Sequence, residues 1–334
     1  MGIGRLRLVA VLAVVVASTV LSQTTPALAD TVINGCTIVP HPGSRHHTDC
    51  PGGDLANVNL ARANLQQANL WGANLLYASL AHANLRHADL RHANLLHSDL
   101  SHADLFRALL RDTHLSRARL SNANLWGAAL SGAYLREATL RRANLEYASM
   151  EFADLFGSHL DHANLHHADL FGANLLGTYL PEADLTEANL DNANLQGADL
   201  TEANLDYADP ERANLRFAKL DGASLRGTDF WWANLHGASL TDADLTGARL
   251  LRADLGGANL TDADLSGADL SYAYLSDAGL PNFHTHLTNA NLTDANFTGA
   301  NLTDADLTGV IWSNTTCPDG TNSDANGGTC VGHL

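Results

Sequence analysis

Histidine is the residue type that comes closest to forming a reactive site in this sequence. The chain of 334 residues contains 17 histidines, and five of them stand at five-residue steps: His82, His87, His92, His97 and His102. Imidazole nitrogens bind Zn²⁺ and Cu²⁺, and a site for either ion needs at least three ligands from the protein. Whether several of these side chains can reach one ion therefore depends on how the chain turns between them.

No catalytic motif accompanies these histidines. The sequence lacks the GxSxG nucleophile elbow, the phosphate-binding P-loop and the HExxH zinc motif. Ser, His and Asp are common because the variable positions of a repeat are polar, whereas repeated Leu and Ala provide no polar cleft in which such groups could converge. The sequence therefore predicts a protein that is not an enzyme and that uses no cofactor.

A repeat of five residues occupies most of the chain. Every fifth residue from position 55 to position 280 is Leu, usually with Ala two residues before it and Asn or Asp one residue before it. The exceptions at the Leu position are Met150, Pro210 and Phe230. After Leu280 the register slips by two residues and resumes at Leu287.

A period of five excludes both regular secondary structures. On an α-helix five residues advance about 500°, so successive leucines form no stripe, and on a flat strand they alternate between faces. All the leucines can point inward only if the chain turns after each unit, and right-angle turns close a square coil after about 20 residues. Positions 20 apart do share their exceptions: the residue before Leu is Asn or Asp at ten of eleven positions in the column 64–264, but at three of eleven in the column 79–279.

Tandem A(D/N)LXX units, such as Ala63-Asn64-Leu65-Gln66-Gln67, resemble the pentapeptide repeat family over about residues 54–312. The resemblance implies an all-β fold, a right-handed quadrilateral β-helix with Leu and Ala inside and Asn, Asp and the variable residues outside. At four units a coil, the rod would have about thirteen coils and a length of about 60 Å. At the position before Leu, we expect Asn and Asp to interchange freely.

Two interruptions of the pattern predict local irregularities. Pro210 has no backbone N–H, so we expect a bulge and a missing ladder hydrogen bond there. The register slip near 281–286 predicts a small protruding loop.

Residues 1–29 are typical of a secretory signal peptide. Arg5 and Arg7 precede an apolar run, and Ala27 and Ala29 are the small residues that signal peptidase requires. The run is shorter than the roughly 20 residues that a membrane-spanning helix needs. We therefore expect a secreted, extracellular protein that does not insert into a membrane after cleavage; an uncleaved anchor is the alternative.

The four cysteines lie in two short segments that flank the repeats, an N-terminal cap at 30–53 and a C-terminal cap at 313–334. In an oxidising compartment, local pairing is the simplest of the three possible connectivities. It gives the bridges Cys36–Cys50 and Cys317–Cys330. The spacing within each pair is longer than the close CxxC spacing of zinc sites, so we expect disulfides rather than a metal.

Only two of the five-step histidines would share a face of a square coil. His82 and His102 would lie one coil apart, about 4.8 Å along the rod, whereas their neighbours would point in other directions. No third ligand is evident, so the sequence predicts no metal site and leaves this pair as the candidate.

Charge is distributed unevenly along the chain. The formal net charge is −17, but residues 30–150 carry 11 basic and 9 acidic groups, whereas residues 151–334 carry 6 and 27. This balance argues against direct binding of nucleic acid. Because some pentapeptide repeat proteins are DNA mimics that bind type II topoisomerases, the resemblance makes an acidic rod bound to such a protein an alternative function. Export argues against it, since the target would be intracellular.

Outward aromatic residues are the remaining candidates for an interaction surface. Aromatic residues make up only 6% of the chain, and exposed large apolar groups often mark contacts with partners. The candidates are Trp71, Phe106, Trp126, Phe171, Trp231 and Trp232. We therefore predict a secreted, non-enzymatic repeat scaffold with an extended surface for an unknown protein or surface ligand, and an oligomer is compatible with this architecture.

Overall fold

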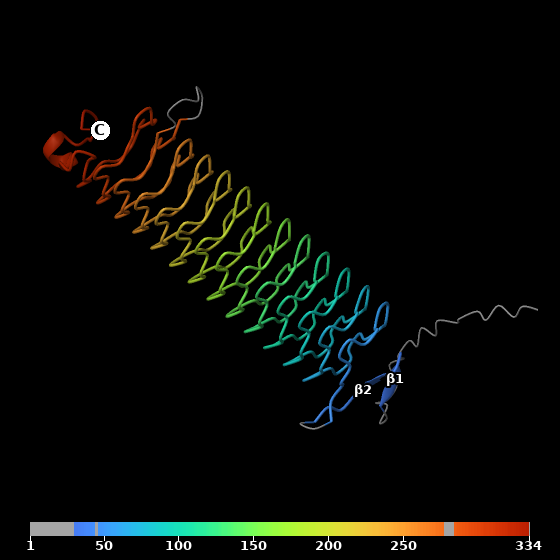
Figure 1. Cartoon of the computed structure of the whole chain (residues 1–334). Coiled ribbons are helices and arrows are strands. Elements are labelled where there is room, and N and C mark those ends of the chain that lie inside the picture. The colour runs from blue at the N-terminus through green and yellow to red at the C-terminus, as the bar shows by residue number, and fades with distance from the viewer. Residues whose placement is uncertain (1–29, 44–45, 277–283, 334) are drawn as a thin grey trace, which may run out of the picture.

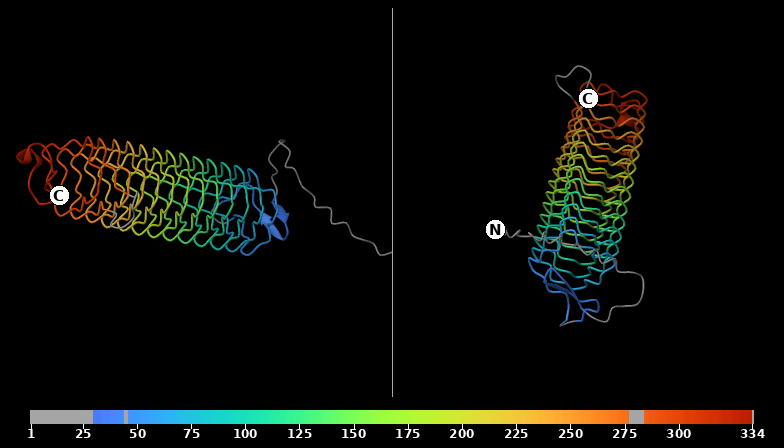
Figure 2. Two further views of the ribbon diagram at one scale, coloured as in Figure 1. Left: turned by 90° about the horizontal axis from the view of Figure 1, so that it is seen from above. Right: turned by 90° about the vertical axis from the view of Figure 1, so that its right-hand side faces the viewer.

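The computed structural model describes residues 30–43, 46–276 and 284–333 (Figure 1). The segment predicted to be a signal peptide lies outside these residues. The repeats form coils that stack into a straight rod, with the two ends of the described chain at opposite ends of the rod (Figures 1 and 2). Within the described part, no helix has the length and apolar character needed to cross a membrane.

Each coil is built from four repeats, and the residue before each Leu forms a parallel bridge with the residue 20 positions further on. Asn64 pairs with Asn84 in this way. The N–H of Leu65 donates to the carbonyl of Asn84 at 2.7 Å, and the N–H of Asn84 donates to the carbonyl of Ala63 at 2.9 Å. The predicted coil of 20 residues is therefore confirmed.

The two variable residues of each repeat form the corner. The N–H of Ala68 donates back to the carbonyl of Leu65 at 3.0 Å, and Gln67 between them has a φ of 58°. A positive φ at the third residue is the property of a type II turn. This geometry repeats along the rod and gives the chain the right-angle turn that the period of five requires.

Leu and Ala fill the interior, and each Leu stacks on the Leu of the next coil. One column has thirteen buried members: Leu55, Leu75, Leu95, Leu115, Leu135, Leu155, Leu175, Leu195, Leu215, Leu235, Leu255, Leu275 and Leu302. Met150, Phe230 and Phe297 take the Leu position in one other column, that of Leu70, and are also buried. A core that repeats the same small cross-section has little room for rings, which accounts for the low aromatic content.

The Asn and Asp residues before Leu form ladders along the rod. The backbone N–H of Arg86 donates to Oδ1 of Asn84 at 3.2 Å, and Nδ2 of Asn84 donates to Oδ1 of Asn64 in the previous coil at 3.0 Å. Both Asn and Asp can accept the first bond, but only Asn can donate the second. Asp104 takes the same position in the next coil and accepts a hydrogen bond from Nδ2 of Asn124 at 2.9 Å. Asp is therefore accommodated in the ladder, but it cannot donate to the previous coil.

Pro210 removes one ladder bond without disturbing the coil. It is buried at the Leu position, and the bridge that would join Asp209 to Asp229 is missing from an otherwise regular ladder. The expected bulge is wrong: the N–H of Ala213 still donates to the carbonyl of Pro210 at 3.1 Å, and the next bridge joins Asn214 to Asn234 in register. The coil therefore accommodates a proline here, and only the hydrogen bond of the missing N–H is lost.

Disulfides join the segments at both ends. Strand β1 (Thr31–Ile33) pairs antiparallel with β2 (Cys36–Ile38), and Cys36 is bonded to Cys50. At the other end, Cys317 is bonded to Cys330, and the short 3₁₀ helix η1 (Ser323–Asn326) lies between them (Figure 1).

The register change near the C-terminal end is an insertion into one coil. Asn259 pairs with His286, so 27 residues instead of 20 separate the two bridge partners. The column of Leu260 accordingly continues with Leu287. Of the loop predicted near 281–286, residues 281–283 lie outside the described residues, whereas Thr285 is buried and His286 already belongs to the ladder.

Candidate interaction surface

One face of the rod carries a continuous run of aromatic and basic side chains. This face contains the repeats centred on every twentieth residue from Leu65 to Leu265, including Leu165, and we call it the Leu165 face. Seven of its residues make up what we call the aromatic stripe: Arg86, His87, Phe106, Arg107, Trp126, Tyr147 and His167. They come from consecutive coils, so their order along the rod follows from the stacking of the coils.

The rings of the stripe are in contact from coil to coil. Phe106 and Trp126 are stacked, with ring centroids 5.0 Å apart and planes 8° from parallel. Trp126 meets Tyr147 edge-to-face at 5.5 Å, and Tyr147 stacks on His167 at 4.8 Å. Because the coils hold successive turns at a fixed spacing, these side chains are ordered on the surface before any partner arrives.

Two guanidinium groups lie against the same rings. The Arg86 guanidinium carbon lies 4.2 Å from the centroid of Phe106, and that of Arg107 lies 5.2 Å from the centroid of Trp126. Arg86 also forms an ion pair of 3.0 Å with Asp104. Within the described residues, Arg107 takes part in no ion pair, so its charge is available to a partner.

The stripe presents ring edges rather than ring faces. Since Phe106 and Trp126 stack along the rod, their faces are covered by each other and by the two arginines. The edge of an aromatic ring carries partial positive charge, and a guanidinium group is a strong donor to carboxylates. Both features favour a partner with carboxylate or carbonyl oxygens over the flat apolar face of a sugar ring.

The sequence-predicted aromatic residues fall into two groups in the structure. Phe106 and Trp126 come together in the stripe. The others lie on the neighbouring face and form separate contacts. Trp71 meets His92 at 5.8 Å, and Phe171 meets Phe152 at 5.4 Å.

The tryptophan pair is also on this neighbouring face. Trp231 and Trp232 meet edge-to-face at 6.5 Å, with Arg212 over Trp231 and Arg252 over Trp232. Trp232 is 50% exposed. Along the chain, about three coils separate this pair from Phe171, so the aromatic residues of this face do not form one run.

His82 and His102 stack face to face. Their ring centroids are 4.7 Å apart and their planes are 5° from parallel. Nitrogen lone pairs lie in the plane of an imidazole ring, so two parallel stacked rings direct them side by side rather than toward one point. In this arrangement the pair does not form the start of a metal site.

Three carboxylates gather beside Pro210 instead. Oxygens of Asp209, Glu211 and Asp229 lie within 4.8 Å of one another. Partial burial raises the pKa of Asp209 above its ordinary value, and the charges of Asp229 and Asp191 add to this effect. Arg249 pairs with Asp229 and offsets part of the negative charge.

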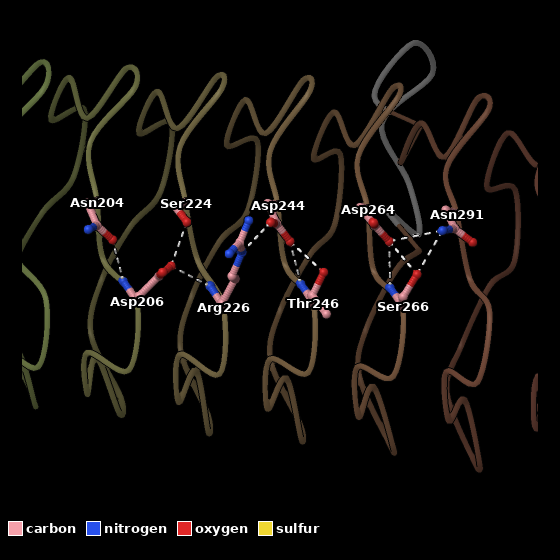
Figure 3. A network of polar contacts seen from close by, with 9 residues as sticks. All are labelled: Asn204, Asp206, Ser224, Arg226, Asp244, Thr246, Asp264, Ser266 and Asn291. Carbon is pink, nitrogen blue, oxygen red and sulfur yellow. Dashed lines mark hydrogen bonds and ion pairs between the residues drawn. The ribbon is translucent and has the colours of Figure 1, made fainter.

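The second half of the Leu165 face carries polar contacts in place of stacked aromatic rings. Figure 3 shows a polar ladder there, in which Asp206 accepts hydrogen bonds from the hydroxyl of Ser224 at 2.6 Å and from the backbone N–H of Arg226 at 3.0 Å. The Arg226 guanidinium in turn donates to Asp244 at 2.5 Å. In this part of the face the acidic groups are engaged with their neighbours, and the stacked aromatic rings are confined to the first half.

Sequence reasoning missed five members of this interaction surface: Arg86, His87, Arg107, Tyr147 and His167. The two variable positions of a repeat lie side by side at a corner, so residues from both positions can join one run. Trp126 and Tyr147 occupy different variable positions, in repeats that lie one above the other in consecutive coils. They meet because the coils stack every 20 residues and because the two variable positions are neighbours at the corner. Both the 20-residue columns and the two variable positions can be read from the sequence, so this contact could have been predicted.

The stacked coils of five-residue units define a β-solenoid protein with a Leu and Ala core. A family model described as pentapeptide repeats matches eight copies in this chain, at 54–91, 73–112, 113–151, 148–186, 182–209, 213–250, 248–280 and 284–311. The chain belongs to the pentapeptide repeat family, and its fold is the right-handed quadrilateral β-helix.

Several solved structures are similar to this chain. HetL, a pentapeptide repeat protein involved in heterocyst differentiation regulation from the cyanobacterium Nostoc sp. strain PCC 7120, is 37% identical; the match covers 72% of this chain and 92% of HetL, with a TM-score of 0.23. A pentapeptide repeat protein from the Arabidopsis thaliana thylakoid lumen is 33% identical over 36% of this chain and 70% of its own, with a TM-score of 0.22. Full-length QnrB1, a plasmid-mediated fluoroquinolone resistance protein, is 19% identical over 56% and 90%, with a TM-score of 0.28. No match was found among curated proteins.

Proposed function

We propose that this protein is an exported, non-enzymatic scaffold that binds a partner through the aromatic stripe. The observation that carries the proposal is the continuous stack of Phe106, Trp126, Tyr147 and His167 with two arginines against it. Trp, Tyr and Arg are the side chains that most often dominate binding energy at protein interfaces. The rigid coil holds them in place, which reduces the entropy lost on binding.

The partner that suits the stripe is a protein segment with acidic side chains. Ring edges and guanidinium groups both attract carboxylates, and Arg107 has no carboxylate of this chain paired with it among the described residues. Export is inferred from the signal peptide that the sequence predicts and is supported by the two disulfides, which are stable outside the cytosol. The partner is therefore an extracellular or cell-surface protein.

The test is a comparison of matched variants in a pull-down. The mature protein is used to capture proteins from the extracellular fraction, beside a Phe106→Ser/Trp126→Ser variant and a Trp231→Ser/Trp232→Ser control. We expect a partner that the control retains and that the stripe variant loses, because only the stripe variant removes the stacked rings. Equal capture by all three proteins would contradict the proposal.

The charge of residues 151–334 favours a second candidate, an acidic rod that binds a topoisomerase-like or other nucleic-acid-binding protein. An extended array of carboxylates resembles a phosphate backbone in charge. The measurement is inhibition of DNA supercoiling by the mature protein at micromolar concentration. Inhibition would support this candidate, and full topoisomerase activity would exclude a topoisomerase as the partner.

A further inference from the structure

Charges change sign once along one corner column of a second face of the rod. This is the face of the repeats centred on Leu160 and on its column, here called the Leu160 face. The corner column of this face is exposed throughout. From the N-terminal end it reads Arg62, His82, His102, Asn122, Arg142, His162, Glu182, Glu202, Gly222, Asp242 and Asp262. Every basic residue therefore precedes His162, or is His162 itself, and every acidic residue follows it.

We propose that the Leu160 face binds the same face of a second copy of this chain, with the two rods antiparallel and a two-fold axis at His162. Such an axis places a residue that lies a given number of coils before His162 opposite the residue that lies the same number of coils after His162 in the second copy. Arg142 then faces Glu182 of the second copy, and Arg62 faces Asp262. His82 likewise faces Asp242, and Asn122 faces Glu202.

A second column on this face has the same symmetry. Its central residue is His159, and the order Asp99, Arg119, Asp199, Lys219 brings Arg119 opposite Asp199 and Asp99 opposite Lys219. Within one chain, Arg119 pairs with Asp99 at 3.7 Å and Lys219 pairs with Asp199 at 3.4 Å. In the dimer, each of these four charges lies beside a charge of opposite sign in its own chain and faces another charge of opposite sign in the second copy.

Other arrangements of two copies lack this match. Parallel rods in register would place Arg142 opposite Arg142 and Glu182 opposite Glu182, which is repulsive. On the Leu165 face, an antiparallel pair would set the aromatic stripe against the polar ladder. The two-fold arrangement on the Leu160 face closes on itself as a dimer, and it spans ten coil steps, about 48 Å of rod.

Arg142 is free to make the new contact. Within the described residues it takes part in no ion pair, whereas neighbouring Arg141 is bound to Asp161 at 2.7 Å. Among the residues that the structure describes, Glu182 has one ion-pair partner, His162 at 3.2 Å, directly beside the two-fold axis. The pairs are exposed, so the attraction is screened by salt and the association depends on ionic strength.

Charge exchange at one pair tests the proposal. The mature chain, Arg142→Glu, Glu182→Arg and the control Arg216→Glu, which changes the same charge on another face, are compared by sedimentation at low and high salt. We expect a dimer at low salt that dissociates at high salt, at least about tenfold weaker association for both single variants and wild-type behaviour for the control.

Mixing the Arg142→Glu and Glu182→Arg chains gives a result that a change in folding would not produce. In the mixed dimer the two substituted side chains, one from each chain, face each other with opposite charges. The unsubstituted Glu182 of the first chain faces the unsubstituted Arg142 of the second, so we expect association to return to the wild-type level. A monomeric wild type at low salt, or single variants that associate as well as the wild type, would overturn the proposal.

Cross-linking tests the position of the axis. In the antiparallel dimer, position 162 faces itself, whereas the two copies of position 102 lie six coils apart, about 29 Å. A short bis-maleimide linker should therefore join His162→Cys chains in pairs but leave His102→Cys chains single. Equal cross-linking of the two variants would exclude this register.

Discussion

At the scale of single residues, aromatic rings at the corners lie over glycines of the next coil. A Cβ atom built on Gly237 would come within 2.5 Å of the Phe217 ring, and one built on Gly172 would come within 2.7 Å of Phe152. Both glycines also have positive φ, 65° and 62°. Glycine at these positions therefore serves two purposes, since it tolerates the turn and leaves room for the ring below.

Two alanine substitutions separate these purposes. Gly197 has a φ of 62°, and a Cβ there would meet nothing within 4 Å. We expect Gly197→Ala to lose about 1 kcal/mol of unfolding free energy from the left-handed backbone alone. Gly237→Ala should lose more, because Phe217 must also leave its position. Chemical denaturation of both variants measures the difference, and equal losses would show that the ring contact contributes nothing.

At the scale of elements, the C-terminal segment is held by a charged hydrogen-bond cluster as well as by its disulfide. The hydroxyl of Thr321 donates to Asp319 at 2.6 Å, its backbone N–H donates at 2.9 Å, and His333 lies 2.7 Å from the other carboxylate oxygen. These bonds lower the pKa of Asp319 to about 2. All three stabilise the ionised carboxylate and attach the end of the chain to the segment that follows Cys317.

This pKa gives the C-terminal segment a defined pH dependence. Because the folded-state pKa is below the ordinary value of about 3.9, the stabilisation is complete above pH 4 and is lost as the pH falls toward 2. We expect the protection factor of the Thr321 amide, which is its exchange rate relative to an unstructured peptide at the same pH, to fall over this range in the wild type. Asp319→Asn should exchange faster already at pH 5 and change less on acidification. A control, Asp304→Asn, removes the same charge from the preceding coil and should follow the wild type.

The sequence was sufficient for the coil but not for all of its contacts. The five-residue period sets the turn, the 20-residue columns set the number of repeats in a coil, and the positions of the cysteines give the two disulfides found in the structure. The effect of Pro210 was overestimated because the expectation of a bulge assumed a flat ladder, whereas each repeat contributes only one bridge and the loss stays local. The aromatic stripe was missed because it crosses between two repeat positions that are neighbours only at a corner.

At the scale of the whole molecule, surface patterns depend on the rotation between the two halves of the rod. All four faces use the same inward Leu and Ala, so the core accepts any whole number of repeats. The surface does not, because each added or removed repeat turns one half by a quarter turn against the other. The basic and acidic halves of the Leu160 face therefore stay on one face only if repeats are added or removed between them in multiples of four.

Deletions of different length distinguish the core from the surface. Removing residues 168–187 takes out one coil and joins His167 to Ala188. Glu202 then takes the place of Glu182 opposite Arg142, so we expect the dimer to persist, although more weakly because Arg119 now faces Lys219. Removing residues 168–172 takes out one repeat and joins His167 to Ala173, which moves the acidic half to another face. We expect both proteins to fold with the same circular dichroism spectrum, because every Leu still points inward. Only the shorter deletion should be monomeric by sedimentation at low salt, and a dimer of that protein would show that the charge order of this face does not hold the two copies together.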